Sequence, residues 1–117
     1  MKFIPEACTG EEALFEGHFE VKAPNFEQRY QYMDDSGFDL TQKEGQELDK
    51  EQTRAQMRSL RKLVGYSKDH VESVSIKRKK DNKEFKSFDE LSNDPSCDAL
   101  LIDLGTKMVT GFELGNG

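Results

Sequence analysis

Residues 95–110 constrain the fold of this chain most strongly, because apolar side chains recur there with the period of an α-helix. The residues at positions i, i+4, i+7 and i+11 of this stripe are Cys97, Leu101, Leu104 and Met108. Leu100 widens the stripe. Asp94 and Pro95 supply a helix start, since aspartate caps free backbone N–H groups and proline is tolerated at the first helical position. With Gly111 as a natural stop, the pattern predicts a buried helix.

The rest of the chain is more polar. In 117 residues, 34% are hydrophobic and 34% are charged, which allows one modest core. Eight Phe and three Tyr supply large buriable surfaces and argue against disorder throughout. We therefore predict a single domain over residues 1–117, with mobile ends at 1–12 and 113–117.

The sequence indicates neither export nor membrane insertion. Its longest apolar run, 99–102, is far shorter than the roughly 18 residues of a membrane span. The first ten residues lack the basic head and apolar stretch of an export signal. A reducing interior is therefore expected, in which Cys8 and Cys97 stay free thiols.

A strand and a short helix are predicted in the first third of the chain. Residues 15–23 alternate between apolar and polar side chains, which is typical of a half-buried strand. Its inward side chains would be Phe15, Phe19, Val21 and Ala23. Asn25 and Gln28 then form a capping box, and a turn follows at 34–37. The buried stripe of this helix would be Phe26, Tyr30 and Met33.

A long helix is predicted next. Thr41 and Glu44 make a second capping box, from which the helix would run to about Val64 and stop at Gly65. Its apolar positions are Leu48, Met57, Leu60, Leu63 and Val64. Because residues 49–56 are almost all polar, we expect the first half of this helix to be solvated or frayed.

A hairpin and another short helix follow. Residues 70–78 alternate at Val74 and Ile76, residues 79–83 turn the chain, and 84–86 can return beside 70–78 as a hairpin. Ser87 and Glu90 make a third capping box over a short helix. The order of elements predicts an α+β fold, in which a small antiparallel sheet with a hairpin packs against three to four helices, including one long helix.

Residues that could perform a reaction do not converge in the sequence. A zinc site built from His18, His70 and the two cysteines would need four scattered positions to meet. Asp34, Asp35 and Asp39 lack the spacing of a calcium loop. Neither a glycine-rich phosphate loop nor a nucleophile elbow is present. We expect a protein that is not an enzyme and that uses no metal or cofactor.

The net charge of −6 is unevenly distributed. Residues 54–86 contain eleven Lys or Arg against four Asp or Glu, a local charge of +7, which leaves −13 elsewhere. A basic patch on the predicted hairpin comprises Lys77, Arg78, Lys79, Lys80, Lys83 and Lys86. It could contact phosphates, and Arg54, Arg58 and Arg61 on one side of the long helix could extend it. We favour a charged edge that prevents sheet-to-sheet aggregation. Self-association through opposite charges remains a third interpretation.

The second half of the chain carries a series of short motifs that resembles a known family. They are KLVGYSKDH at 62–70, VSIK at 74–77, KSFDEL at 86–91, DP at 94–95 and GFELGN at 111–116. This succession, over residues 60–116 and with weaker support from 19–30, is similar to the small tail assembly chaperones of tailed bacteriophages.

The resemblance implies a protein that acts in the cytoplasm of the bacterial host and is not expected in the mature virion. It would bind the tape measure protein and keep that long helical chain soluble until tail-tube subunits polymerise round it. We place the partner surface on those apolar side chains of the last helix that lie outside its main apolar stripe. The same side chains could instead be buried in the core or in a dimer interface. These residues are Leu100, Ile102, Val109 and Phe112. The alternatives are a small phage-encoded nucleic-acid-binding or inhibitor protein that uses the 77–86 hairpin, and a virion structural protein.

Overall fold

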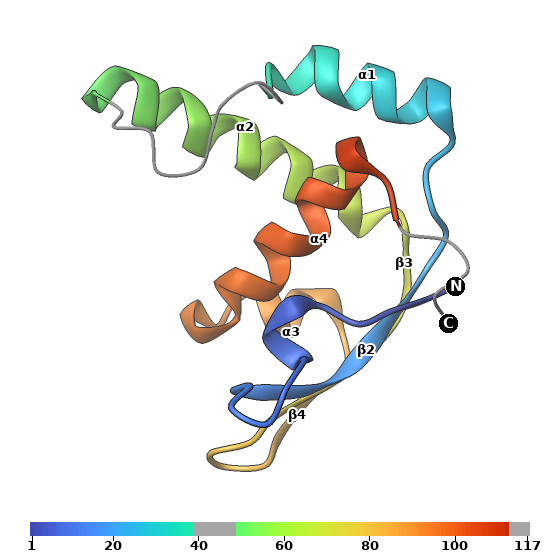
Figure 1. Cartoon of the computed structure of the whole chain (residues 1–117), viewed down its shortest axis with the longest axis vertical. Helices are drawn as coiled ribbons and strands as arrows, with labels where there is room; N and C mark the ends of the chain where they lie inside the picture. The colour runs from blue at the N-terminus through green and yellow to red at the C-terminus, as the bar shows by residue number, and fades with distance from the viewer. Residues whose placement is uncertain (39–48, 113–117) are drawn as a thin grey trace.

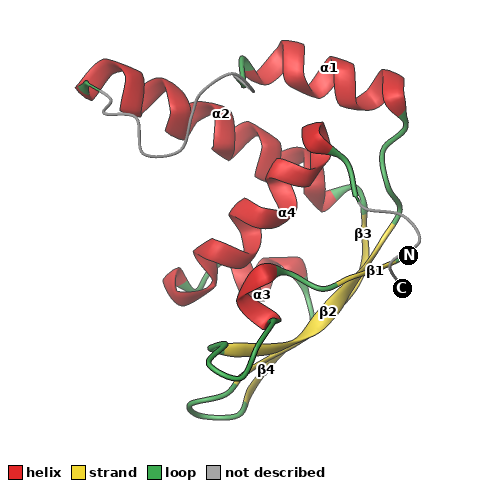
Figure 2. Ribbon diagram, viewed as in Figure 1, coloured by secondary structure: helices red, strands yellow, loops and turns green. Residues whose placement is uncertain are grey.

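The computed structural model of the chain describes residues 1–38 and 49–112, which form a four-stranded antiparallel sheet with helices gathered on one side (Figures 1 and 2). The strands follow the order β1-β2-β3-β4 across the sheet. The α+β fold predicted from the order of elements is confirmed. A short 3-10 turn, Glu6–Cys8, links the first two strands.

The two central strands are distant in sequence. β2 (Phe15–Val21) and β3 (Val71–Arg78) pair antiparallel, with Phe19 opposite Val74. The flanking strands are short: β1 (Lys2–Phe3) pairs with β2, and β4 (Lys83–Phe85) pairs with β3. The predicted hairpin is therefore confirmed as β3 and β4.

The alternation predicted for the first strand holds over β2 itself. Phe15, Phe19 and Val21 are buried. Ala23, which was predicted to share their side, is exposed, because β2 ends two residues earlier. Gly17 lies within the strand at φ +120°, where a Cβ would collide with the carbonyl oxygen of Ser75. Only glycine lets the two strands approach so closely at this point.

α4 (Asp98–Thr110) is the central helix of the core. It continues from a 3-10 turn, Pro95–Cys97, and the Asp94 side chain accepts a hydrogen bond from the backbone N–H of Ser96 at the start of that turn, as predicted. The predicted apolar stripe is buried, together with Leu100. Gly111 ends the helix with φ +86°, as expected for a glycine stop.

α4 packs against a second layer through Gly105. A Cβ on this glycine would lie 3.0 Å from the backbone nitrogen and 3.1 Å from the Cγ2 atom of Val64 in α2 (Lys50–Lys68). The two helix backbones therefore come unusually close. As a result, α4 has the sheet on one side and α2 on another, so that both sides require apolar side chains.

α2 is the predicted long helix, but its ends differ from the prediction. The capping box expected at 41–44, and Leu48, lie outside the described residues. The described helix begins at Lys50 and is capped by Asp49, which forms a reciprocal capping box with Gln52. It also continues through Gly65, so the predicted stop there is wrong. The physical reason is that the buried face extends for another turn, to Ser67.

α3 (Phe88–Ser92) is capped by Ser87, as predicted. The Ser87 hydroxyl accepts a hydrogen bond from the Glu90 N–H at 3.2 Å. The Glu90 carboxylate accepts from the N–H of Lys86 at 3.4 Å instead of from that of Ser87. The serine half of the predicted capping box therefore forms, but the glutamate half contacts Lys86, one residue before the predicted Ser87.

Candidate partner-binding surface

Most of the residues predicted to offer a partner surface on the last helix belong to this chain's own core. Leu100 is fully buried and Val109 is buried. Phe112 is half-buried, and its ring packs edge-on against Phe3 with centroids 5.1 Å apart. Ile102 keeps 39% of its surface exposed. The expectation that Leu100 and Val109 offer apolar surface to a partner is wrong, because α4 is covered on more than one side.

α1 (Phe26–Ser36) supplies the exposed apolar face instead. Its predicted capping box is confirmed, with the Asn25 side chain accepting from the Gln28 N–H at 2.9 Å. The helix continues through most of the turn expected at 34–37, so that turn is wrong. It ends at Gly37, which adopts the left-handed conformation with φ +70°.

The stripe of α1 that was predicted to be buried faces solvent. Phe26 is 70% exposed and Tyr30 is 56% exposed, while Met33 is half-buried. We call these three residues the α1 apolar surface. Beside it, between α1 and the end of α4, is a shallow hollow of about 230 Å³. Its lining consists of Phe26, Arg29, Tyr30, Met33, Val109 and Thr110.

The opposite side of α1 is held by a buried histidine. His70 Nδ1 lies 2.8 Å from the carbonyl oxygen of Lys22, and His70 Nε2 lies 2.7 Å from the hydroxyl of Tyr32. Because a carbonyl oxygen can only accept, Nδ1 carries a hydrogen and donates to Lys22, and Nε2 shares a hydrogen bond with the tyrosine hydroxyl. The imidazole therefore ties α1 to the segment between β2 and α1.

Further contacts set the orientation of α1 on α2. The rings of Tyr32 and Tyr66 stack with centroids 4.5 Å apart, and the Tyr66 hydroxyl donates to the Asp35 carboxylate at 3.1 Å. Burial raises the pKa of both tyrosines, so both remain donors near neutral pH. The Ser59 hydroxyl donates to the Ser36 carbonyl at 2.7 Å. These polar contacts turn the α1 apolar surface outward.

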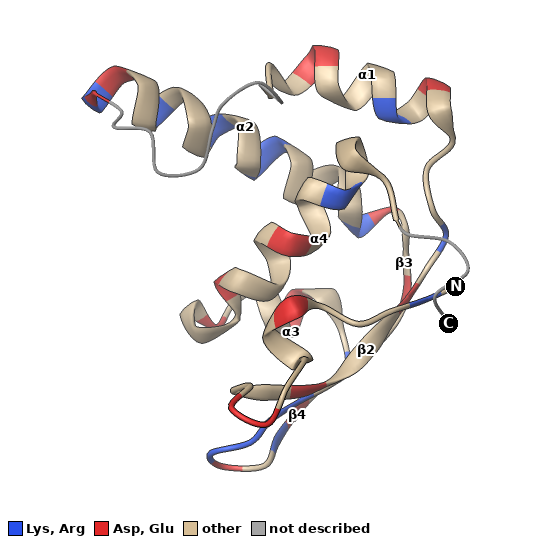
Figure 3. Ribbon diagram, viewed as in Figure 1, with Lys and Arg blue, Asp and Glu red and all other residues tan. Residues whose placement is uncertain are grey.

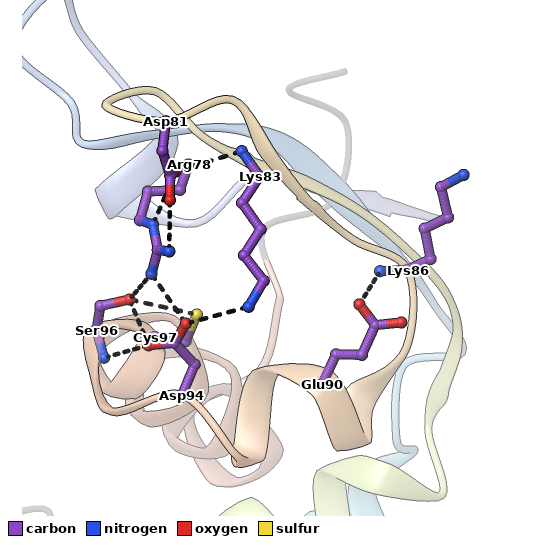
Figure 4. A network of polar contacts seen from close by, with 8 residues as sticks. All are labelled: Arg78, Asp81, Lys83, Lys86, Glu90, Asp94, Ser96 and Cys97. Carbon is purple, nitrogen blue, oxygen red and sulfur yellow. Dashed lines mark hydrogen bonds and ion pairs between the residues drawn. The ribbon is translucent and has the colours of Figure 1, made fainter.

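The basic hairpin is partly neutralised by a network at its base (Figure 4). Arg78 pairs with Asp81 at 2.8 Å and with Asp94 at 2.9 Å, and donates to the Ser96 hydroxyl at 2.7 Å. The hydrogen bond from Arg78 lowers the pKa of Asp81 to about 2. Lys83 also approaches Asp94, at 3.9 Å. Arg78 therefore joins the hairpin to the beginning of the last helical segment.

Other cations of the hairpin also have acidic neighbours. Lys77 pairs with Glu16 at 2.8 Å, and Lys86 lies 3.6 Å from Glu84. Lys79 and Lys80, near the tip, have no carboxylate within 4 Å in the parts of the chain that the structure describes. Figure 3 shows basic and acidic positions side by side here. The arrangement favours the charged-edge interpretation, while nucleic-acid binding by the hairpin stays an untested alternative.

The groups that carry chemistry most often are engaged or scattered. Cys8 and Cys97 are free thiols, as predicted, and burial raises the pKa of Cys8 to about 11, which suppresses its reactive thiolate. His18 lies 3.4 Å from Glu20 at the surface of β2. Across residues 1–38 and 49–112, no three His, Cys, Asp or Glu side chains are arranged to hold a metal. No helix among the described elements combines the length and apolarity needed to cross a bilayer.

The contacts that orient α1 were not predicted. Tyr32 and Ser36 lie four residues apart on one side of α1, and this i, i+4 pair was the available signal for a packed face. A stripe of larger apolar residues at similar spacing competed with it. Comparisons with protein-family models, with curated proteins and with solved structures found no match to this chain.

Proposed function

We propose that this chain is a tail assembly chaperone of a tailed bacteriophage. It binds the tape measure protein in the cytoplasm of the bacterial host and is not retained in the mature virion. The proposal rests on the motif succession over residues 60–116 and, among the structural features, on the outward α1 apolar surface.

The exposed aromatic side chains are the observation that carries a protein-binding function. Adjacent Phe26 and Tyr30 on one helix face leave apolar area in water beside a hollow that a partner side chain can enter. Full burial of a large apolar side chain contributes roughly 1.5–3 kcal/mol. Covering Phe26, which is 70% exposed, would then contribute roughly 1–2 kcal/mol to binding.

The surface suits a long helical partner. An amphipathic helix can lay its apolar face along the hollow between α1 and the end of α4. Met33 is flexible and polarisable, so the same surface can accept different side chains in turn. The net charge of −6 helps to keep the chaperone itself dispersed. Together these properties fit transient holding of successive segments of one long chain.

Co-expression tests the proposal directly. The chain is produced together with the tape measure protein of the same phage, and the soluble, co-purifying fraction of that partner is measured. The test variant is F26S/Y30S. The matched control is I4S/L14S, which removes two exposed large apolar side chains outside α1, at 52% and 74% exposure.

We expect the unmodified chain and the I4S/L14S control to keep the partner soluble, and F26S/Y30S to lose this ability while its circular dichroism spectrum is unchanged. If F26S/Y30S still solubilises the partner, the α1 apolar surface is not the binding site. If the unmodified chain neither solubilises nor retains the partner, the chaperone function itself is rejected.

A further inference from the structure

A second surface, on the outward side of α2, carries cations that the proposed function does not use. Arg54, Arg58 and Arg61 are all exposed and follow one another at i, i+4 and i+7. Met57 lies among them and is 57% exposed. At 100° per residue these four side chains share one side of the helix, and we call them the α2 arginine face.

This face points away from the rest of the protein. The buried residues of α2 are Ser59, Leu63 and Ser67, which lie on the opposite side of the helix. The three arginines have no carboxylate within 4 Å among the residues that the structure describes, whereas Lys68 on the same helix pairs with Asp89 at 3.1 Å. The basic positions are visible along α2 in Figure 3.

The first half of α2 is also accessible. Residues 50–58 are exposed except for the half-buried Gln56, and this end of the helix extends beyond the sheet and α4 (Figure 1). The reciprocal capping box between Asp49 and Gln52 satisfies the first free N–H groups and holds the extension in helical form. The arginines are thus presented on an ordered helix rather than on a loop.

We propose that the α2 arginine face binds an acidic, amphipathic segment of a partner polypeptide, with an aliphatic side chain of that segment seated on Met57. Arginine and methionine are among the side chains enriched at protein interfaces, and guanidinium groups pair with carboxylates in a fixed two-pronged geometry. Cations beside one apolar side chain are complementary to carboxylates beside another. This site is separate from the α1 apolar surface and does not depend on the proposed function.

A protein partner fits the face better than a nucleic acid. Met57 lies beside the arginines, and residues 50–62 of the helix contain no aromatic side chain that could stack on a base. The hairpin cations that would extend a track of phosphate contacts largely have acidic neighbours, as in the Lys77–Glu16 pair. The protein as a whole is also acidic, with a net charge of −6, which opposes a polyanion at long range.

The test uses a labelled synthetic helical peptide of roughly 18 residues, in which glutamates at i, i+4 and i+7 surround a leucine at i+3. Binding to the full chain is followed by fluorescence anisotropy at about 50 mM salt and about 200 mM salt. The test variant is R54Q/R58Q/R61Q, and M57Q tests the apolar anchor. The control K79Q/K80Q/K86Q removes the same charge from the hairpin, and a duplex DNA of about 20 base pairs serves as the competing ligand.

We expect the R54Q/R58Q/R61Q variant to weaken peptide binding about tenfold, because each exposed ion pair contributes a few-fold, and the hairpin control to change it less than about twofold. M57Q should weaken it without altering its salt dependence. Equal binding by the triple variant, or no binding of the peptide to the unmodified chain, overturns the proposal. The proposal is also overturned if duplex DNA binds more tightly than the peptide and the same three substitutions abolish DNA binding.

Discussion

Two glycines in helix interiors should respond in opposite ways to the same substitution. Alanine is favoured over glycine inside a helix by about 0.8–1.0 kcal/mol. At Gly65 of α2 an added Cβ would have no heavy atom within 4 Å among the described residues, apart from its chain neighbours and the backbone of its own helix. Gly65→Ala should therefore raise the free energy of unfolding by roughly 1 kcal/mol.

At Gly105 of α4 the same methyl group meets the backbone of α2. It would lie 3.0 Å from the nitrogen of Val64 and 3.2 Å from the carbonyl carbon of Leu63, and backbone atoms cannot rotate away as a side chain can. Overpacking of this kind costs about 1–3 kcal/mol. After subtraction of the helix-propensity gain, Gly105→Ala should lower the free energy of unfolding by as much as roughly 2 kcal/mol.

Urea denaturation followed by circular dichroism measures both variants, and thermal unfolding gives a second reading at roughly 4 °C per kcal/mol for a domain of this size. The gap between the two variants should equal the overpacking cost. Should Gly105→Ala prove as stabilising as Gly65→Ala, α2 and α4 do not approach as closely as described. α4 would then not be packed on two sides.

Two further predictions concern polar contacts. Tyr32→Phe leaves the buried Nε2 of His70 without its hydrogen-bond partner and should lower the free energy of unfolding by about 1–3 kcal/mol in urea titrations. A change below about 0.3 kcal/mol would show that the hydrogen bond does not hold α1. The pKa of Asp81 is about 2 in the folded chain against an ordinary value of 3.8, so its contribution to stability is complete above the ordinary value and is lost as the pH falls from about 4 to 2. Asp81→Asn should flatten that part of the stability profile, and an unchanged slope would assign the acid sensitivity to other carboxylates.

Elements with local signals could be predicted from the sequence. The stripe of α4 and its Asp94 cap, the β3–β4 hairpin, and the Asn25 capping box each depend on residues within a few positions of one another. Hydrophobic period and capping chemistry report on such spacing directly. The α+β class followed from the order of these elements.

The orientation of α1 could not be predicted in this way. Which side of α1 packs is decided by Tyr32 and His70, 38 positions apart in the sequence, and by Ser36 and Ser59, 23 positions apart. Periodicity identified an apolar stripe on α1. It carries no information on which side of the helix a neighbouring element packs. The candidate partner surface was therefore predicted on α4, whereas the exposed apolar side chains lie on α1.

The burial of Leu100 and Val109 has a related cause. A single sequence shows that α4 has apolar side chains on more than one side, but not whether the second side meets a partner or another part of the same chain. Gly105 contained the missing information, since a glycine inside an apolar helix can mark a close helix contact. Its meaning becomes clear only when α2 is placed against it.

The pairing of β2 with β3 also affects how the chain reaches its fold. Paired residues of the two strands, such as Val21 and Val71, are separated in the sequence by both α1 and α2. The chain must therefore close a long loop before the hydrogen bonds between β2 and β3 can form. Contacts of such large sequence separation slow folding. During synthesis β2 emerges well before its neighbour, and α4, which covers both strands, emerges later still. The core can therefore close only when nearly the whole described chain is present, as one late and cooperative event.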